Sequence, residues 1–210
     1  MKSWADTLAG VRRQNLVHAA LAAVLLVVLV WALPVRRAGE EGGHHGAHAP
    51  VLDAFERAGV SELKEGQRGP AFRLARLDGG WATPETWKER LVVLNFWATW
   101  CTPCTLEMPT LEALWREYEG RGLVVVGVSV DRGAPRGLID PYVKNLKLSF
   151  PILLDPQMKT AGAWRVTGLP ATFLIRPGGE VAGMAVGARE WNSAPMKALV
   201  ESLLPGRLGH

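Results

Sequence analysis

The chain has two cysteines, which lie close together as Cys101-Thr102-Pro103-Cys104. An apolar run precedes them and a helical pattern follows, which places the pair where a buried strand gives way to a helix. A disulfide that closes so short a loop stabilises a fold by only about 2 kcal/mol, so structural stapling explains it poorly. At the start of a helix, unpaired N–H groups and the helix dipole stabilise an anion, which favours the thiolate of Cys101.

A thiolate in this position can exchange disulfides with another protein. We predict that Cys101 is the nucleophile that forms a mixed disulfide and that Cys104, one turn further on, resolves it. Thr102 and Pro103 lie between the two sulfurs on the side that meets the substrate, and Trp100 offers apolar surface beside them. The pattern indicates dithiol–disulfide chemistry with no cofactor other than the pair itself.

Zinc binding is the chemical alternative for two cysteines at this spacing. It requires a second pair of ligands, which the predicted domain lacks because His210 is terminal and the other histidines lie outside the domain. His44, His45 and His48 could hold copper or zinc, but they stand in a Gly- and Ala-rich segment without cysteine or carboxylate partners, which favours a solvated tether. We therefore predict no metal site.

The segments around the cysteines have the patterns of a parallel sheet. The apolar run Leu91–Trp97 predicts a central strand covered on both faces, and the run over 123–130 predicts a second one. Apolar residues at helical spacing between them predict a helix, so strand, helix and strand form a right-handed parallel crossover. We also expect strands over 71–77, 81–83, 150–154, 171–175 and 181–186, an insertion over 131–148, and helices within 51–66, from 83, near 142–146, over 157–166 and from 193.

The N-terminal region predicts a membrane anchor. Between Arg13 and Arg36 lie about 22 residues without a formal charge, which as a helix would span roughly 33 Å. A cleaved signal peptide is the alternative, but the stretch is longer than the apolar part of a signal, and the small-residue site at 47–49 is followed by proline. We predict a cytoplasmic tail over 1–13, a single transmembrane helix over 14–35, a His/Gly-rich tether with a short helix over 36–68, and a globular domain over 69–205 outside the cytoplasm.

Charge argues against a nucleic-acid partner. The 210 residues carry a formal net charge of +4, but Lys and Arg are scattered among Asp and Glu. No basic run or interleaving of basic and aromatic residues is present, so we interpret the charge as a mixed solvated surface.

The cysteine segment resembles the thioredoxin superfamily, and most closely its membrane-anchored TlpA/ResA-like branch. The resemblance covers about 69–204 and rests on Val92-Val93-Leu94-Asn95-Phe96-Trp97-Ala98-Thr99-Trp100-Cys101-Thr102-Pro103-Cys104, Glu107-Met108-Pro109 and Gly168-Leu169-Pro170-Ala171-Thr172-Phe173. It implies an α/β thioredoxin-like fold with an N-terminal β-hairpin and a central insertion.

The resemblance adds residues to the predicted site. It implies that Pro170 follows a cis peptide bond beside the cysteines and that Leu169 offers backbone hydrogen bonds to an extended substrate. Glu107 matches an acidic residue that assists proton movement at the buried thiol, with a solvated helix glutamate as the alternative. Pro109 matches a helix kink. Asn95 stands where cytoplasmic thioredoxin has aspartate, and since an amide cannot accept a proton at neutral pH, the acid–base work shifts toward Glu107.

These features predict a thiol-disulfide oxidoreductase. The resemblance implies a reductase that takes electrons from a membrane thiol donor of the CcdA/DsbD type and reduces disulfides of exported proteins, with apocytochrome c during cytochrome maturation as first candidate. An oxidant that installs disulfides differs only in reduction potential, which the CTPC sequence does not fix. A peroxidase of the peroxiredoxin type is disfavoured because the Thr and Pro that surround its reactive cysteine are not visible. A copper-site reductase or metal-handling partner protein is the alternative of a different class.

Overall fold

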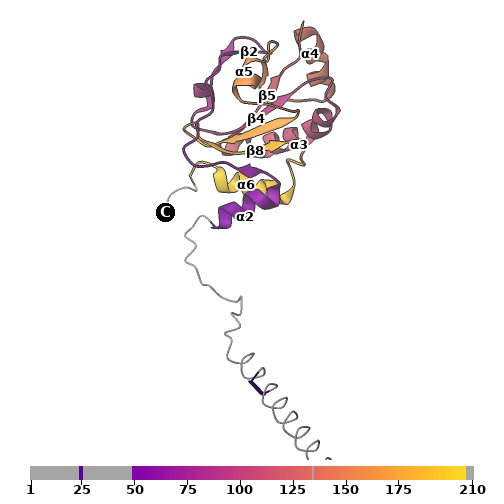
Figure 1. Cartoon of the computed structure of the whole chain (residues 1–210). Helices are drawn as coiled ribbons and strands as arrows, with labels where there is room; N and C mark the ends of the chain where they lie inside the picture. Colours follow the sequence, from indigo (N-terminus) through magenta and orange to yellow (C-terminus); the bar gives the residue numbers. More distant parts are fainter. Residues whose placement is uncertain (1–23, 26–48, 134, 207–210) are drawn as a thin grey trace, which may run out of the picture. The chain divides into compact units, whose positions relative to one another are not determined.

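The computed structural model describes residues 24–25, 49–133 and 135–206 (Figure 1). The chain divides into two compact units, Met1–His44 and His45–His210. Of the predicted anchor over 14–35 only Val24 and Leu25 are described, as helix, and the tail over 1–13 lies outside the described residues. No helix within the described ranges is long and apolar enough to cross a bilayer. The anchor and its orientation remain predictions.

The second unit is built on one mixed sheet. Among the described residues the sheet has eight strands in the order β1-β8-β7-β4-β5-β6-β2-β3. In chain order the elements are α2 (Ala49–Ala58), β1 (Ser61–Glu62), β2 (Leu74–Arg76), β3 (Trp81–Ala82), the 3-10 helix η1 (Pro84–Trp87), β4 (Leu91–Trp97), α3 (Thr102–Tyr118), the 3-10 helix η2 (Glu119–Arg121), β5 (Leu123–Ser129), α4 (Pro135–Asn145), β6 (Ile152–Leu154), α5 (Lys159–Ala163), β7 (Ala171–Ile175), β8 (Val181–Val186) and α6 (Ala194–Leu203).

The centre of the sheet confirms the predicted crossover. Strand β4 pairs in parallel with β5 and antiparallel with β7, and every residue of β4 and β5 is buried. A strand covered on both faces needs apolar residues at successive positions, which is why these two runs lack an alternating pattern. The hairpin of β7 and β8 and the hairpin of β2 and β3 are also formed.

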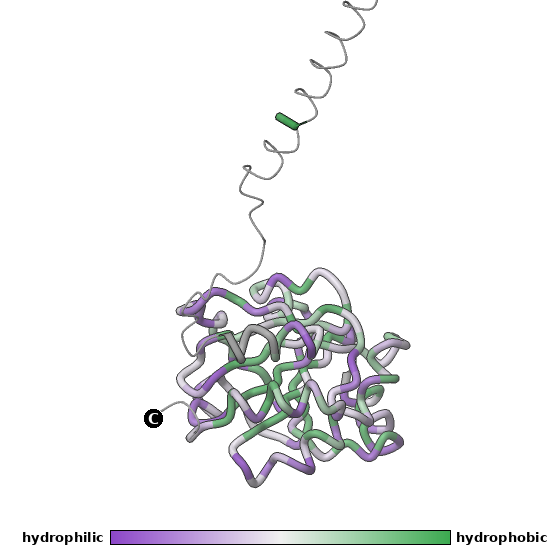
Figure 2. Tube along the Cα trace, turned by 90° about the horizontal axis from the view of Figure 1, so that it is seen from below, coloured by the Kyte–Doolittle hydropathy of each residue, from purple (hydrophilic) through white to green (hydrophobic). Residues whose placement is uncertain are grey.

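Helices and loops cover the two faces of the sheet. Figure 1 shows α2 and α6 on one side of the sheet and α5 on the other. On the face that carries Asn95, the side chain of Asn95 contacts Glu107 of α3. On the opposite face Phe96 packs against Trp164 and Phe173, with ring centroids 6.2 and 6.0 Å apart. Figure 2 shows hydrophobic segments through the middle of the domain, as expected for a core buried between these layers.

The packed fold includes residues before 69. Strand β1 pairs with β8, where Ser61 lies opposite Met184. Phe55 of α2 is almost fully buried and lies so close to Gly183 that an added methyl group there would meet its ring at 2.7 Å. The amphipathic stretch expected within 51–66 is therefore a helix over 49–58, followed by an edge strand.

Two other helices differ from their predicted ranges. The insertion helix α4 covers Pro135–Asn145, whereas the sequence predicted a helix near 142–146. Helix α5 covers only Lys159–Ala163 of the predicted 157–166. A proline usually marks a helix boundary, but Pro141 lies inside α4, which hid the first half of this helix from the sequence pattern.

Candidate active site

The cysteine pair lies at the N-terminus of α3. Cys101 is the N-cap residue, and its sulfur accepts a hydrogen bond of 3.3 Å from the backbone N–H of Cys104. The two sulfurs form a disulfide. Cys101 keeps 5% of its surface exposed, while Cys104 has none. The geometry matches the predicted roles of an attacking sulfur near solvent and a second sulfur behind it.

A surface groove opens beside Cys101. It encloses about 540 Å³ and brings together residues that follow β4, residues that precede β7, and Met158 before α5: Trp100, Cys101, Thr102, Pro103, Met158, Val166, Thr167, Gly168 and Leu169. Four of the predicted substrate-binding residues, Trp100, Thr102, Pro103 and Leu169, line it. The Leu169–Pro170 peptide bond is cis, as the resemblance implied, whereas Pro170, the fifth predicted substrate-binding residue, is buried and does not line the groove.

The sequence did not identify Met158 as a groove residue. Met158 has a positive φ of 55° and precedes α5, and its sulfur accepts a hydrogen bond of 3.5 Å from Arg132. Its position depends on how the loop after β6 returns to the cysteine end of the sheet. No local motif signals such a return.

Glu107 is buried rather than solvated. Its side chain lies on α3, and only 1% of its surface is exposed, which contradicts the alternative of a surface glutamate. Three donors surround the carboxylate: Asn95 Nδ2 at 2.7 Å, Trp191 Nε1 at 3.0 Å and the backbone N–H of Arg189 at 3.1 Å. Burial raises the pKa of Glu107, and these hydrogen bonds offset part of that rise. A carboxyl group held in this way can take up and release a proton nearer to neutral pH than a surface glutamate.

Asn95 connects the central strand to this carboxyl group. Its Nδ2 also donates to Thr172 Oγ1 on β7 at 2.9 Å, while its Oδ1 has no hydrogen-bond partner among the described residues. Both donor hydrogens are therefore directed at side chains close to the cysteine end of the sheet. The amide itself does not titrate, so Glu107 is the group here that can carry a proton.

Asp131 holds the loop that leads to the cysteines. Its carboxylate accepts hydrogen bonds from the backbone N–H of Thr99 at 3.0 Å, from Thr99 Oγ1 at 2.7 Å and from Ser129 Oγ at 2.8 Å. Asp131 is 1% exposed. The sequence placed this residue only at the start of an insertion, because nothing near it in the chain indicates a contact with residue 99.

The described residues contain no group of three or more His, Cys, Asp or Glu side chains arranged to hold a metal ion. His44, His45 and His48 lie outside the described residues, so their solvated state remains a prediction. The structure likewise leaves the absence of a cofactor as a prediction.

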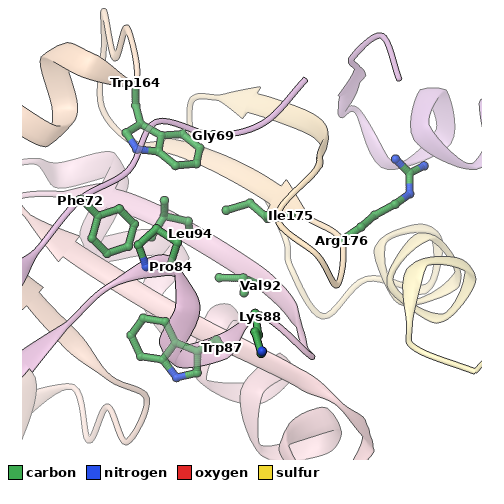
Figure 3. Close-up of a pocket in the computed structure, with 11 residues that line it drawn as sticks. Gly69, Phe72, Pro84, Trp87, Lys88, Val92, Leu94, Trp164, Ile175 and Arg176 are labelled. Atoms are coloured by element: carbon green, nitrogen blue, oxygen red, sulfur yellow. The ribbon is translucent and has the colours of Figure 1, made fainter. Parts of the chain in front are cut away.

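A second pocket lies on the face of the sheet that carries Phe96, opposite Asn95. Figure 3 shows Phe72, Pro84, Trp87, Leu94 and Trp164 around it, together with Val92, Lys88, Ile175 and Arg176. Its volume is about 40 Å³, which is room for a few water molecules at most. Its lining is mainly apolar and does not include the cysteines. We therefore interpret it as a packing gap.

The sheet order, the redox-active pair at a strand–helix junction and the cis-proline loop in the same groove define a thioredoxin-like thiol-disulfide oxidoreductase. Residues 66–184 match the AhpC/TSA family. The thiol-disulfide oxidoreductase ResA of Bacillus subtilis (strain 168) is 33% identical over 130 residues, which are 62% of this chain and 72% of the relative. ResA of Geobacillus thermodenitrificans is 34% identical over 140 residues, 67% of this chain and 78% of the relative. The chain therefore belongs to the AhpC/TSA family and is a thiol-disulfide oxidoreductase of the ResA type.

A solved structure agrees with this assignment. The crystal structure of a Chlorobium tepidum protein, provisionally named thiol:disulfide interchange protein DsbE, superimposes with a TM-score of 0.61 at 27% identity. The match covers 67% of this chain and 98% of the other. The thioredoxin-like α/β fold predicted from the sequence is thus confirmed for the globular part of the chain.

Proposed function

We propose that this enzyme is a reductase of disulfides in exported proteins, with apocytochrome c as its first candidate substrate. The observation that carries the exchange chemistry is the asymmetry of the cysteine pair: Cys101 lines an open groove, whereas Cys104 is fully buried on the helix that carries Glu107. The direction of electron flow and the substrate rest on the resemblance to the TlpA/ResA-like branch. The names of similar proteins, thiol-disulfide oxidoreductase and thiol:disulfide interchange protein, support a role in thiol-disulfide exchange.

The reaction follows from this asymmetry. In the dithiol form, the Cys101 thiolate attacks one sulfur of the substrate disulfide, forms a mixed disulfide and releases the other substrate sulfur as a thiolate, which takes up a proton. Cys104 then loses its proton and attacks the Cys101 sulfur, which restores the Cys101–Cys104 disulfide and releases the second substrate thiol. Two electrons and two protons pass to the substrate in total. Glu107 is the buried carboxyl group that we assign to the proton transfer at Cys104.

The cycle requires a dithiol donor that reduces the pair again. We propose a membrane thiol donor of the CcdA/DsbD type, and we propose that the uncharged segment over 14–35 forms a transmembrane helix that anchors the catalytic domain outside the cytoplasm. A membrane-impermeant maleimide tests the location, because in intact cells it should label Cys101 after mild reduction. Labelling that appears only after lysis would place the domain on the other side of the membrane.

Trapping of the mixed disulfide tests the substrate. Full-length Cys104→Ser, expressed in the native membrane, should accumulate adducts that reductant releases, and mass spectrometry should identify apocytochrome c among them. The matched Cys101→Ser variant should accumulate none. Adducts that never include an apocytochrome would overturn the cytochrome assignment while leaving the exchange chemistry intact.

The reduction potential separates the reductase from an oxidant. We expect a value near that of thioredoxin, about −270 mV, measured by equilibration of the full chain with glutathione or a thioredoxin reference. A value near that of strong periplasmic oxidants, about −120 mV, would overturn the reductase assignment.

A further inference from the structure

The insertion between β5 and β6 contacts residues 99–112, which include the cysteine pair and the first turns of α3, at three places. At its start, Asp131 accepts hydrogen bonds from Thr99, as described above. In its middle, Tyr142 of α4 donates a hydrogen bond of 2.9 Å to Thr105 Oγ1 on α3. At its end, the backbone N–H of Ser149 donates at 2.8 Å to a carboxylate oxygen of Glu112, and Ser149 Oγ donates at 2.7 Å to the other. A segment that only covered the sheet would not need polar contacts to the catalytic helix and to the loop before it.

Tyr142 contacts the chain on both sides of the cysteine pair. Its ring stacks on Trp97, the last residue of β4, with centroids 4.9 Å apart and planes inclined by 24°. Its hydroxyl group reaches Thr105, the residue that follows Cys104. Thr105 Oγ1 in turn donates to the carbonyl oxygen of Cys101 at 3.3 Å, beside the backbone hydrogen bond of 3.1 Å from Thr105 N–H to the same oxygen. The phenol thus begins a hydrogen-bond chain that ends on the peptide group of the nucleophile.

The phenol is suited to act as a donor in this chain. Burial raises the pKa of Tyr142, and the carboxyl groups of Asp131 and Glu107 add to the rise. Tyr142 therefore stays protonated at neutral pH. Because hydrogen bonds in a chain polarise one another, loss of the first donor weakens the hold of Thr105 on the Cys101 carbonyl group.

We infer that Tyr142 is a positioning residue for the redox pair, which acts through Thr105 to hold the first turn of α3 in the geometry of the Cys101–Cys104 disulfide. The insertion helix then sets the balance between the disulfide and dithiol forms. This inference rests on the thiol-disulfide exchange of the enzyme and is independent of which substrate it reduces.

Tyr142→Phe tests the inference, because it removes the hydroxyl group and keeps the ring on Trp97. Loss of a hydrogen bond that favours the disulfide form should shift the equilibrium of the full chain with glutathione toward the dithiol by about threefold to tenfold. Tyr118→Phe is the matched control. It removes the only other tyrosine hydroxyl group of the chain, which lies at the far end of α3 and donates to Glu201, and it should leave the equilibrium unchanged.

A double-mutant cycle separates this role from a structural one. Thr105→Val should shift the same equilibrium in the same direction, and the Tyr142→Phe/Thr105→Val variant should shift it no further than the larger single change. A wild-type equilibrium in Tyr142→Phe would overturn the inference even if the melting temperature fell, and so would additive shifts in the double variant. Failure of the wild-type chain to cycle with glutathione would instead refute the exchange chemistry itself.

Discussion

Asn95 Nδ2 on the central strand donates a hydrogen bond of 2.7 Å to Glu107 Oε1 on the cysteine helix, and both side chains are buried. The bond connects the strand that ends at the active site to the helix that begins there. A buried carboxylate is costly unless it is hydrogen-bonded, and this one receives three donors from two separate segments of the chain, β4 and the loop between β8 and α6. An apolar side chain could fill this site without the free-energy cost of burying a carboxylate. The presence of Glu107 therefore supports a role in proton transfer.

Glu107→Gln should slow resolution of the mixed disulfide by Cys104 by about a hundredfold, because the amide cannot accept a proton. The measurement is stopped-flow release of a model mixed disulfide, followed across about pH 5 to 9, where the variant should also lose the pH dependence of the wild type.

Glu112→Gln is the control for this change. Glu112 is a second buried glutamate on α3. Its carboxylate accepts hydrogen bonds from Arg116 and Ser149 rather than from the donors that surround Glu107. The Glu112→Gln variant should resolve the mixed disulfide at the wild-type rate. Equal rates in Glu107→Gln and the wild type at every pH would show that Glu107 takes no part in the proton transfer.

Glu107 should also make the disulfide form less stable as pH rises. Burial raises the pKa of Glu107 above its ordinary value of 4.5, so in the pH range just above this value the folded state binds more protons than the unfolded chain. The free energy of unfolding must then fall as pH increases from 4.5 to the pKa of the folded state. Glu107→Gln removes this titration. Urea unfolding from about pH 4 to about pH 8 should therefore show the wild type losing stability relative to the variant. A constant difference between the two would contradict the raised pKa.

The sequence predicted the parts of the site that depend on local pattern. The Cys101–Cys104 pair, the buried strand before it and the helix after it all lie within one continuous segment, and their spacing carries the chemistry. The partners of Glu107 were not predictable in this way. Arg189 and Trp191 come from the loop between β8 and α6, and they reach Glu107 because α6 lies beside α3, where Lys197 pairs with Glu117.

The contacts of the insertion were hidden for a related reason. Tyr142 was recognised as part of a helix, but its hydrogen bond to Thr105 depends on how α4 lies against α3. A sequence pattern shows which face of a helix is apolar and does not show which hydrogen bonds form once two helices meet.

Asp131→Ala should destabilise the domain by about 2 to 4 kcal/mol, because it leaves the N–H and hydroxyl groups of Thr99 and the hydroxyl group of Ser129 without their acceptor. Urea unfolding measures the change. Asp140→Ala is the matched control, since Asp140 lies exposed on α4 and its loss should change stability by less than about 0.5 kcal/mol. Similar losses in the two variants would mean that the buried contacts of Asp131 contribute little.

Gly127 and Gly137 should respond in opposite directions to substitution by alanine. Gly127 lies in the middle of β5, where an added Cβ would come within 2.9 Å of Ile152 Cδ1, 2.9 Å of Trp97 Nε1 and 3.1 Å of Phe150 Cε2. These atoms belong to large buried side chains on two segments, the end of β4 and the stretch at the start of β6, so they cannot all move aside. We expect Gly127→Ala to cost about 1 to 3 kcal/mol by overpacking.

Gly137 lies in α4, and a Cβ added there meets no atom within 4 Å. Alanine loses less conformational entropy than glycine in a helix, so Gly137→Ala should stabilise the domain by about 0.5 to 1 kcal/mol. Thermal or urea unfolding of the two variants beside the wild type measures both effects.

Because Gly127→Ala displaces Trp97, on which Tyr142 stacks, it should also change the equilibrium with glutathione, whereas Gly137→Ala should not. A stable Gly127→Ala variant with the wild-type equilibrium would show that the packing around Trp97 is looser than these distances require.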